Sequence, residues 1–361
     1  MIYYKDKKHS FVELFNEKNG FLIRSNKIVD GIESNMQADR RSFPELIDIG
    51  IMGHCHAVKS GMCKSAGVDC YQDSLSRNRP NMSVEDYKRL LYQCKGKTFQ
   101  VALGGAGDPN KHESFQEILQ YTRRLGIVPN LTTSGYNLSN DEVGLMKNYC
   151  GASAVSFYSR LDKSMNETNL TTISAINSLV DAGCKVNVHY VLSEDTLEEA
   201  LIRIQYGLFP KGINAVVFLL YKAVGTGKQE KVLSGNDGRY IEFLKHIHLA
   251  KTDFKIGFDT CQSPGLFCHN QELSIETIDA CEAARFSMYI DSDLVAFPCS
   301  FGCNQTDYCV DLKQSSIEEA WNSDQFEQFR FRQDTMCGTC DIEGCVGCAL
   351  DIDLNVCGRF N

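Results

Sequence analysis

Three cysteines in one short stretch are the first residues in the chain whose type and spacing could do chemistry. They are Cys55, Cys63 and Cys70, within GIMGHCHAVKSGMCKSAGVDCYQ. Their spacing is too wide for a C-x-x-C redox pair and too loose for an ordinary zinc finger. Three thiolates can hold a [4Fe–4S] cluster and leave its remaining iron open to another molecule. His54 or His56 could instead complete a Cys3His zinc site that fixes a loop, which is the alternative.

The composition narrows the class of protein. The chain has 361 residues, 43% of them hydrophobic, and its net charge is -9. The acidic balance and the lack of a Lys/Arg-rich run argue against binding to nucleic acid. We find no secretory signal and no apolar stretch long enough to span a membrane, so we expect a cytoplasmic protein that binds no membrane. In that compartment, those of the 17 cysteines that cluster in the sequence are expected to bind metal rather than to form disulfides.

Segments with strand and helix patterns alternate through the middle of the chain. Expected strands are 46–52, 99–105, 128–135, 152–158, 185–192 and 215–222. Expected helices are 83–94, 113–126, 139–150, 171–183 and 197–208. This alternation is typical of an α/β fold with parallel strands and helical crossovers, either an open doubly wound sheet or a (β/α) barrel. Residues 1–45 are expected to form a small strand-rich cap, and residues 223–260 a final helix and strand.

Glycine-rich or polar residues follow the early strands. GGAGDP follows 99–103, TTSGYN follows 128–131, and the cysteine loop follows 46–52. Parallel strands bring their carboxyl ends to one edge, where α/β proteins build their sites. We therefore expect these segments to meet.

The order of these features resembles the radical S-adenosylmethionine (radical SAM) superfamily over residues 47–260. That family has a three-cysteine loop after the first strand of a partial (β/α)6 barrel, a glycine motif after the second strand and a T-T-N-G-like end to the third. The matching residues are Gly104, Gly105, Ala106, Gly107, Asp108 and Pro109, then Thr132, Thr133, Ser134 and Gly135. The loop departs from the usual C-x3-C-x2-C, because seven residues separate Cys55 from Cys63 and six separate Cys63 from Cys70.

The C-terminal hundred residues resemble the SPASM domain, the auxiliary-cluster extension of peptide- and protein-modifying radical SAM enzymes. Eleven cysteines lie between Cys261 and Cys357. MYIDSDLVAFPC resembles the hairpin that ends at Cys299, with Leu294 at the usual glycine, and SSIEEAWNSDQFEQFRFR resembles the helix that follows. The resemblance predicts a barrel over 46–260 and a cysteine-rich, loop-rich SPASM-like domain over 261–361.

The resemblance also implies ligands for two auxiliary iron–sulfur clusters, which we expect to be [4Fe–4S]. One cluster would take an upstream cysteine together with Cys281, Cys299 and Cys348. We favour Cys268 as the upstream ligand over Cys261. The second cluster would take Cys337, Cys340, Cys345 and Cys357. Cys303 and Cys309 receive no role, and two structural zinc sites are the alternative for the whole tail. Cys94, Cys150 and Cys184 are expected to be small buried apolar residues.

Contacts to S-adenosylmethionine follow from the same resemblance. Its amino and carboxylate groups would bind the open iron of the Cys55/Cys63/Cys70 cluster. The residues implied in its binding are Gly104 and Gly105 beside the methionine moiety, Asp108 at the ammonium, Ser134 and Ser156 at the carboxylate or ribose, Arg160 at the carboxylate, and Asn187 or His189 at the ribose.

The implied function is reductive cleavage of S-adenosylmethionine to a 5′-deoxyadenosyl radical that modifies a ribosomally made peptide, with a thioether or carbon–carbon cross-link as product. The implied partners are this precursor peptide, a flavodoxin- or ferredoxin-type electron donor and a separate leader-binding protein, unless residues 1–45 pair with the leader by strand addition.

Two alternatives remain open from the sequence. One is a maturase that oxidises a Cys or Ser of a sulfatase-like protein, for which Asp259 is a candidate general base. The other is a non-catalytic iron–sulfur or zinc scaffold, which would keep the cysteines but would not need the glycine motif.

Overall fold

The fold was analysed in a computed structural model of the chain. It describes residues 1–163, 166–270, 272–274, 277–338, 340, 342, 344–352, 354 and 356–359. In this described part, no helix is both long and apolar enough to span a lipid bilayer.

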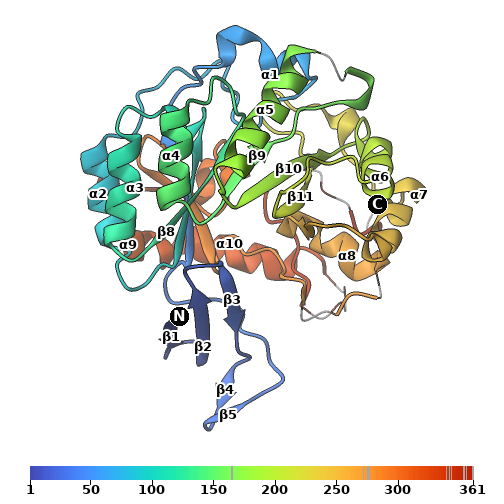
Figure 1. The fold of residues 1–361 in the computed structure, drawn as a ribbon. Coiled ribbons are helices and arrows are strands. Elements are labelled where there is room, and N and C mark those ends of the chain that lie inside the picture. The colour runs from blue at the N-terminus through green and yellow to red at the C-terminus, as the bar shows by residue number, and fades with distance from the viewer. Residues whose placement is uncertain are drawn as a thin grey trace.

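A single curved sheet organises the molecule (Figure 1). Within the described residues it has ten strands in the order β12-β11-β10-β9-β8-β7-β6-β13-β14-β15. The strands from β6 to β12 all pair in parallel. They are β6 (Leu46–Met52), β7 (Gln100–Gly105), β8 (Val128–Thr133), β9 (Ser153–Ser156), β10 (Val186–Leu192), β11 (Ala215–Leu220) and β12 (Lys255–Phe258). The parallel α/β fold is therefore confirmed, with β12 extending the expected six-stranded barrel.

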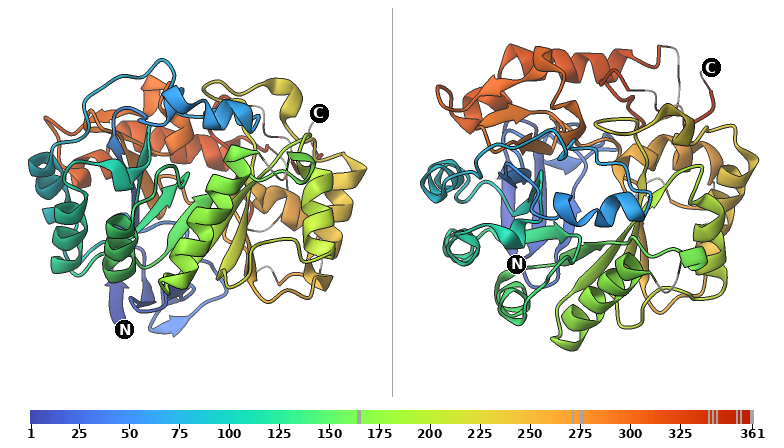
Figure 2. Two further views of the ribbon diagram at one scale, coloured as in Figure 1. Left: turned by 45° about the horizontal axis from the view of Figure 1, so that its top comes forward. Right: turned by 90° about the horizontal axis from the view of Figure 1, so that it is seen from above.

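Helices cover the outside of this open barrel, and Figure 2 shows them around the ring of strands. The barrel helices are α2 (Val84–Tyr92), α3 (Phe115–Arg124), α4 (Asn140–Tyr149), α5 (Glu167–Asp181), α6 (Leu197–Gln205) and α7 (Gly238–His246). Side-chain caps explain where some of them begin. Ser83 accepts a hydrogen bond from the Asp86 backbone, and Ser139 forms a capping box with Glu142. Helix α5 begins four residues before the expected start at 171, because Asn166 caps it.

Short 3-10 helices lie in the connections between the larger elements. They are η1 (Val58–Ser60), η2 (Pro109–Lys111), η3 (Leu161–Lys163), η4 (Gln229–Lys231), η5 (Ile247–Leu249), η6 (Thr260–Gln262), η8 (Ser300–Gly302) and η9 (Thr306–Tyr308).

Side-chain alternation along the strands separates a core layer from the barrel interior. On β6, Ile47, Ile49 and Ile51 are buried in the main hydrophobic core beneath the helices. Asp48 and Gly50 alternate with them and therefore face the interior. Polar and small residues dominate that inner face, so the interior has room for a ligand. A cavity of about 340 Å³ opens at its amino end, lined by residues that include Gln100, Asn130, Asn187 and His189.

The barrel sheet continues into the C-terminal region. Strand β13 (Ser287–Ile290) pairs in parallel with β6, and the antiparallel strands β14 (Val295–Phe297) and β15 (Val310–Asp311) follow. The β13–β14 turn places Leu294 at φ 67°, a left-handed conformation that favours glycine. This agrees with the glycine expected at that position from the SPASM resemblance.

Helices close the C-terminal region as well. They are α8 (Ser263–His269), α9 (Ile317–Trp321) and α10 (Asp324–Thr335). The expected helix at 315–332 is thus two helices, because Ser323 caps a new start after Asn322. Trp321 is buried and its Nε1 donates to the carbonyl oxygen of Arg41 at 2.9 Å, which ties this region to the chain just before β6.

The N-terminal residues form strands, as expected. Strands β1 (Ile2–Asp6), β2 (Phe11–Asn16) and β3 (Phe21–Arg24) make one sheet, and β4 (Ile28–Val29) pairs with β5 (Ile32–Glu33). This part lies at the end of the barrel opposite α1 (Met62–Ser65) (Figure 1).

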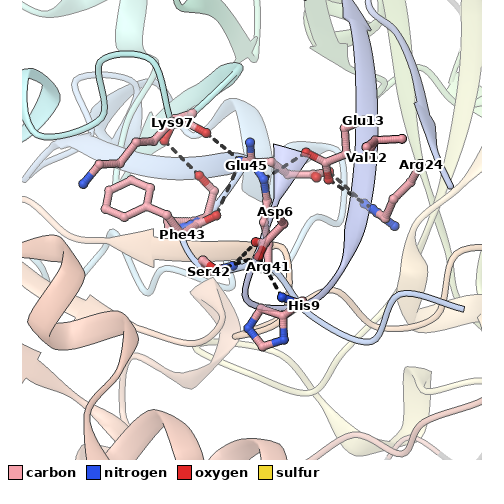
Figure 3. A network of polar contacts seen from close by, with 12 residues as sticks. Asp6, His9, Val12, Glu13, Arg24, Arg41, Ser42, Phe43, Glu45 and Lys97 are labelled. Atoms are coloured by element: carbon pink, nitrogen blue, oxygen red, sulfur yellow. Dashed lines mark hydrogen bonds and ion pairs between the residues drawn. The ribbon is translucent and has the colours of Figure 1, made fainter. Parts of the chain in front are cut away.

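Buried ion pairs join the N-terminal sheet to the barrel (Figure 3). Arg41 Nε lies 2.9 Å from Glu13 Oε2, and neither side chain is exposed. Arg24 donates to Glu45 at 2.9 Å, and burial raises the pKa of Glu45 to about 8. A buried charge network therefore joins the N-terminal sheet to the barrel end away from the cysteine loop.

Candidate active site and cysteine clusters

The cysteine loop crosses the carboxyl end of the barrel, directly after β6 (Figure 2, right). Cys63 lies in the short helix α1, and its thiol interacts electrostatically with the thiols of Cys55 and Cys70. The structure thus brings together the three cysteines that the sequence singled out. Burial raises the pKa of Cys63 to about 11 and also raises the pKa of Cys55. Metal binding would have to displace these protons.

The glycine loop after β7 packs against this cysteine loop. A Cβ on Gly107 would lie 2.5 Å from the carbonyl oxygen of His54 and 3.1 Å from Cys55 Cα. Gly105 has φ 119°, and its Cβ would lie 2.5 Å from the carbonyl oxygen of Met52. Side chains at these two positions would push the loops apart, which explains why the motif is built from glycine.

Cys70 is held from two sides. Its backbone nitrogen donates to Thr226 Oγ1 at 2.7 Å, and the Thr226 nitrogen donates back to the Cys70 carbonyl at 3.0 Å. Thr226 lies in the loop after β11. Ser74 Oγ lies 3.2 Å from Cys70 Sγ and also donates to the carbonyl oxygen of Ala106 in the glycine loop. Loops after β6, β7 and β11 therefore fix the position of this thiol.

Asp108 and Ser134 also meet beside the loop. Asp108 accepts hydrogen bonds from the Ser134 backbone nitrogen at 2.7 Å and from Ser134 Oγ at 2.6 Å. Burial raises the pKa of Asp108. His56 Nε2 lies 4.0 Å from Asp108 Oδ2, and both buried ring nitrogens of His56 lack a hydrogen-bond partner among the described residues. These nitrogens are therefore available to a ligand. The other flanking histidine, His54, contacts the carbonyl oxygen of Arg79 through Nδ1 at 3.2 Å.

The other residues expected to contact S-adenosylmethionine are more dispersed. A Cβ on Gly104 would meet nothing within 4 Å, so this position borders open space. Ser156 pairs in register with His189 across β9 and β10. His189 lines the amino-end cavity, and burial lowers its pKa to about 4.

Two of the residues expected to contact S-adenosylmethionine, Asn187 and Arg160, already have other polar partners. Asn187 lines the cavity at the amino end, where Asn214 donates to its side-chain oxygen at 2.7 Å, so it is not brought to the cysteine loop. Arg160 Nε lies 3.1 Å from Glu199 Oε2, so its guanidinium already has a carboxylate partner.

The tail cysteines form two electrostatic groups. Group 1 is defined as Cys261, Cys281, Cys299 and Cys348, and group 2 as Cys268, Cys337, Cys340, Cys345 and Cys357. In group 1, the Cys299 thiol interacts with those of Cys281 and Cys348, and the Cys261 thiol with those of Cys281 and Cys299. In group 2, the Cys345 thiol interacts with the other four thiols of that group.

This grouping differs from the expected ligand sets at one position. Cys268, favoured as the upstream partner of Cys281, interacts instead with Cys357 and Cys340. Cys261 takes the place beside Cys281. The physical reason is helix α8, which begins at Ser263 and carries Cys268 in its last turn, away from Cys261.

The remaining cysteines lie outside these groups. Cys303 Sγ donates to the Ser300 carbonyl at 3.0 Å, and Cys309 Sγ to that of Thr306 at 3.1 Å. Cys94 is buried in the core, as expected, whereas Cys150 and Cys184 are only partly buried and pack against that core.

The spacing of the thiol groups decides which kind of metal site they fit. Among the described residues, no three His, Cys, Asp or Glu side chains converge closely enough for one metal ion. A [4Fe–4S] cluster places each thiolate on a different iron and so spans a wider separation. The partly buried thiol groups of three, four and five members are compatible with such clusters.

Sequence reasoning missed two charged residues near these sites. Asp48 faces the interior, and burial, followed by the charge of Glu282, raises its pKa to about 7. Lys222 is buried at the end of β11, where its Nζ lies 2.8 Å from Asp259 Oδ2. That pairing occupies the carboxylate proposed from the sequence as a general base. The signal for Asp48 was a lone charge in the apolar run LIDIGIM.

Comparisons with known proteins agree with this architecture. Residues 281–345 match the SPASM family, described as an iron–sulfur cluster-binding domain. Streptococcus suis SuiB aligns with a TM-score of 0.65 and 18% identity over 92% of this chain and 90% of that chain. The structure of anSMEcpe with bound AdoMet aligns with a TM-score of 0.58 and 14% identity over 87% of this chain and 90% of that chain. None of the curated proteins matches the sequence.

The C-terminal segment is therefore a SPASM domain, and the chain has the fold of SuiB and anSMEcpe. This confirms the fold expected from the radical SAM resemblance. The structures of SuiB include one bound to S-adenosylmethionine and one bound to the precursor peptide SuiA.

Proposed function

We propose that this protein is a radical SAM enzyme that modifies a ribosomally made peptide. The observation that carries the proposal is the meeting of the Cys55, Cys63 and Cys70 thiols with the glycine loop at the carboxyl end of the barrel, in a chain with a SPASM domain. A [4Fe–4S] cluster with S-adenosylmethionine, when bound there, supplies a 5′-deoxyadenosyl radical that abstracts a hydrogen atom from an unactivated carbon.

The chain's own residues would hold and orient this chemistry. Cys55, Cys63 and Cys70 supply three thiolates, despite their wide spacing in sequence. Ser134 orients Asp108, which would accept a hydrogen bond from the ammonium of S-adenosylmethionine. Gly104 and Gly105 would lie beside its methionine moiety, and Ser156, with His189 next to it in register, would contact the ribose.

Two auxiliary [4Fe–4S] clusters complete the proposal. Group 1 holds one cluster with Cys261, Cys281, Cys299 and Cys348, so Cys261 replaces Cys268 as the upstream ligand. In group 2, Cys337, Cys340, Cys345 and Cys357 hold the other, and Cys268 is the additional thiol. The barrel spans 46–260 and the SPASM region 261–361, with the N-terminal cap at 1–45.

A peptide substrate is supported by the interior space and by the related folds. SuiB was solved with the peptide SuiA and anSMEcpe with the Cp18Cys peptide. The product would be a thioether or carbon–carbon cross-link. A flavodoxin- or ferredoxin-type protein would supply the electron, and either a separate protein or the N-terminal sheet would bind the leader.

A second candidate function is favoured by Asp48. Oxidation of a substrate Ser to an aldehyde, or of a Cys to a thioaldehyde that water hydrolyses to the aldehyde and hydrogen sulfide, removes a hydrogen atom, a proton and an electron. Asp48 faces the barrel interior, where its carboxylate could take the proton. Asp259, considered from the sequence, is a poorer base because Lys222 neutralises it.

The test is anaerobic reconstitution with iron and sulfide, followed by dithionite and S-adenosylmethionine, with 5′-deoxyadenosine measured as product. The matched control is the triple variant Cys55→Ala, Cys63→Ala, Cys70→Ala, which keeps both auxiliary thiol groups. Deoxyadenosine from the wild type alone supports the proposal. None from a wild-type protein with its full iron content would favour the iron–sulfur scaffold.

A further inference from the structure

A buried cation lies between the barrel and group 1. Lys222 follows β11, and its side chain is 1% exposed. Its Nζ lies 2.8 Å from Asp259 Oδ2, donates to the Leu220 carbonyl at 2.8 Å and lies 4.3 Å from the centroid of the Phe301 ring. These contacts hold the ammonium in one place.

The contacts of Lys222 lead directly to group 1. Asp259 precedes Cys261 by two residues, and Phe301 follows Cys299 by two. The Lys222 ammonium interacts electrostatically with the thiols of Cys261 and Cys299. It also interacts with the thiol of Cys348. One ammonium thus interacts with three of the four thiols of group 1.

A fixed cation beside an iron–sulfur cluster has a predictable effect. A cluster with four thiolate ligands is an anion, and reduction adds one more negative charge. A buried ammonium stabilises the reduced form more than the oxidised form, because low polarity strengthens the interaction. The Asp259 carboxylate has the opposite charge and partly offsets this effect.

We propose that Lys222 is a positioning residue that raises the reduction potential of the group 1 cluster, and that Asp259 moderates it. This rests on the proposed function, which assigns a cluster to group 1. A higher reduction potential makes that cluster a better acceptor for the electron that the substrate loses when it is oxidised.

The experiment is a potentiometric titration followed by electron paramagnetic resonance. It uses full-length protein with Cys55→Ala, Cys63→Ala and Cys70→Ala, so that only auxiliary clusters contribute. Into this parent we would introduce Lys222→Met, Lys222→Arg or Asp259→Asn. The matched control is Lys97→Met, because Lys97 lies 2.8 Å from Glu318 Oε2 and 4.5 Å from the Phe43 ring centroid, outside both auxiliary groups.

We expect Lys222→Met to lower one of the two auxiliary potentials. At fixed ambient potential the reduced-to-oxidised ratio should fall at least tenfold, which is about 59 mV for a one-electron couple. Asp259→Asn should shift the same potential upward, while Lys222→Arg and Lys97→Met should leave it near the parent value. Opposite shifts from the two partners of one ion pair would not arise from a purely structural role.

The outcomes separate the two proposals. A parent protein that assembles no auxiliary cluster would contradict the proposed function. A parent with both clusters, whose potentials are unchanged by Lys222→Met and Asp259→Asn, would overturn the role of Lys222. If Lys222→Met fails to fold, Asp259→Asn decides alone: an upward shift supports the role and an unchanged potential overturns it.

Discussion

The Gly107 Cα lies against the Cys55 backbone so closely that a Cβ on Gly107 would fall 3.1 Å from Cys55 Cα. The glycine motif after the second barrel strand therefore has a packing role toward the cysteine loop. This role is separate from any role in admitting a cofactor. The two can be told apart because Gly104, in the same motif, borders open space.

We expect Gly107→Ala to lower the iron bound per chain after reconstitution, because the added methyl displaces Cys55. Gly104→Ala should bind a normal amount of iron but bind S-adenosylmethionine at least tenfold more weakly. Iron analysis and equilibrium binding of S-adenosylmethionine measure the two effects. Full iron content in Gly107→Ala would contradict the packing role.

The upstream ligand of the first auxiliary cluster gives a second prediction. Cys261→Ser should remove one cluster, about four irons per chain, because Cys261 lies with Cys281 and Cys299. Cys268→Ser should keep that cluster, because Cys268 belongs to group 2. Mössbauer spectra and iron content of the two variants check this. The reverse result would restore Cys268 as the ligand favoured from the sequence.

Local signals explain why most of the barrel could be predicted from sequence. Apolar runs such as LIDIGIM marked strands, and Ser83 and Ser139 marked helix starts because their side chains cap the first turn. The sequence could not predict which side chains from distant segments of the chain contact one another. The choice between Cys261 and Cys268 depends on the direction of helix α8. Lys222 and Asp259, which pair with each other after β11 and β12, lie 37 residues apart in the sequence.

The same limit applies to the cofactor residues. Asp108 and Ser134 were found together because both follow neighbouring strands at the carboxyl edge. Asn187, one of the two residues implied at the ribose, lies beside Asn214 and lines the amino-end cavity together with His189. Period-2 alternation tells which face a residue takes, whereas its height along the barrel depends on register.

The buried ion pair between Arg41 and Glu13 gives a third prediction. Arg41→Met should lower the free energy of unfolding by about 3 kcal/mol, because the buried Glu13 loses its nearer partner and keeps only Arg24 at 3.4 Å. Arg40, which precedes Arg41 in the sequence, offers a matched control. Arg40 pairs with Glu327 at the surface, so Arg40→Met should cost less than about 1 kcal/mol. Urea denaturation of the reduced apoprotein measures both, and equal losses would contradict the structural role of the network.

The interior carboxyl of Asp48 gives a prediction on pH. Its pKa is raised to about 7 by burial, above the ordinary value for Asp. The folded protein therefore keeps a proton that the unfolded chain loses near pH 4, and stability falls as the pH rises toward 7. Asp48→Asn removes this penalty, so its advantage over wild type in unfolding free energy should grow by on the order of 2 kcal/mol between pH 5 and pH 8.

Urea denaturation of both apoproteins at pH 5, 6, 7 and 8 measures this difference. Glu282 interacts with Asp48 and burial raises its pKa to about 8, so the difference between the two proteins includes the coupling of these two carboxyl groups. The exposed Asp307→Asn is the control and should show no growing advantage. In the reconstituted enzyme, Asp48→Asn should still form deoxyadenosine. It should lose aldehyde product if Asp48 accepts the substrate proton, whereas undiminished aldehyde would exclude Asp48 as that base.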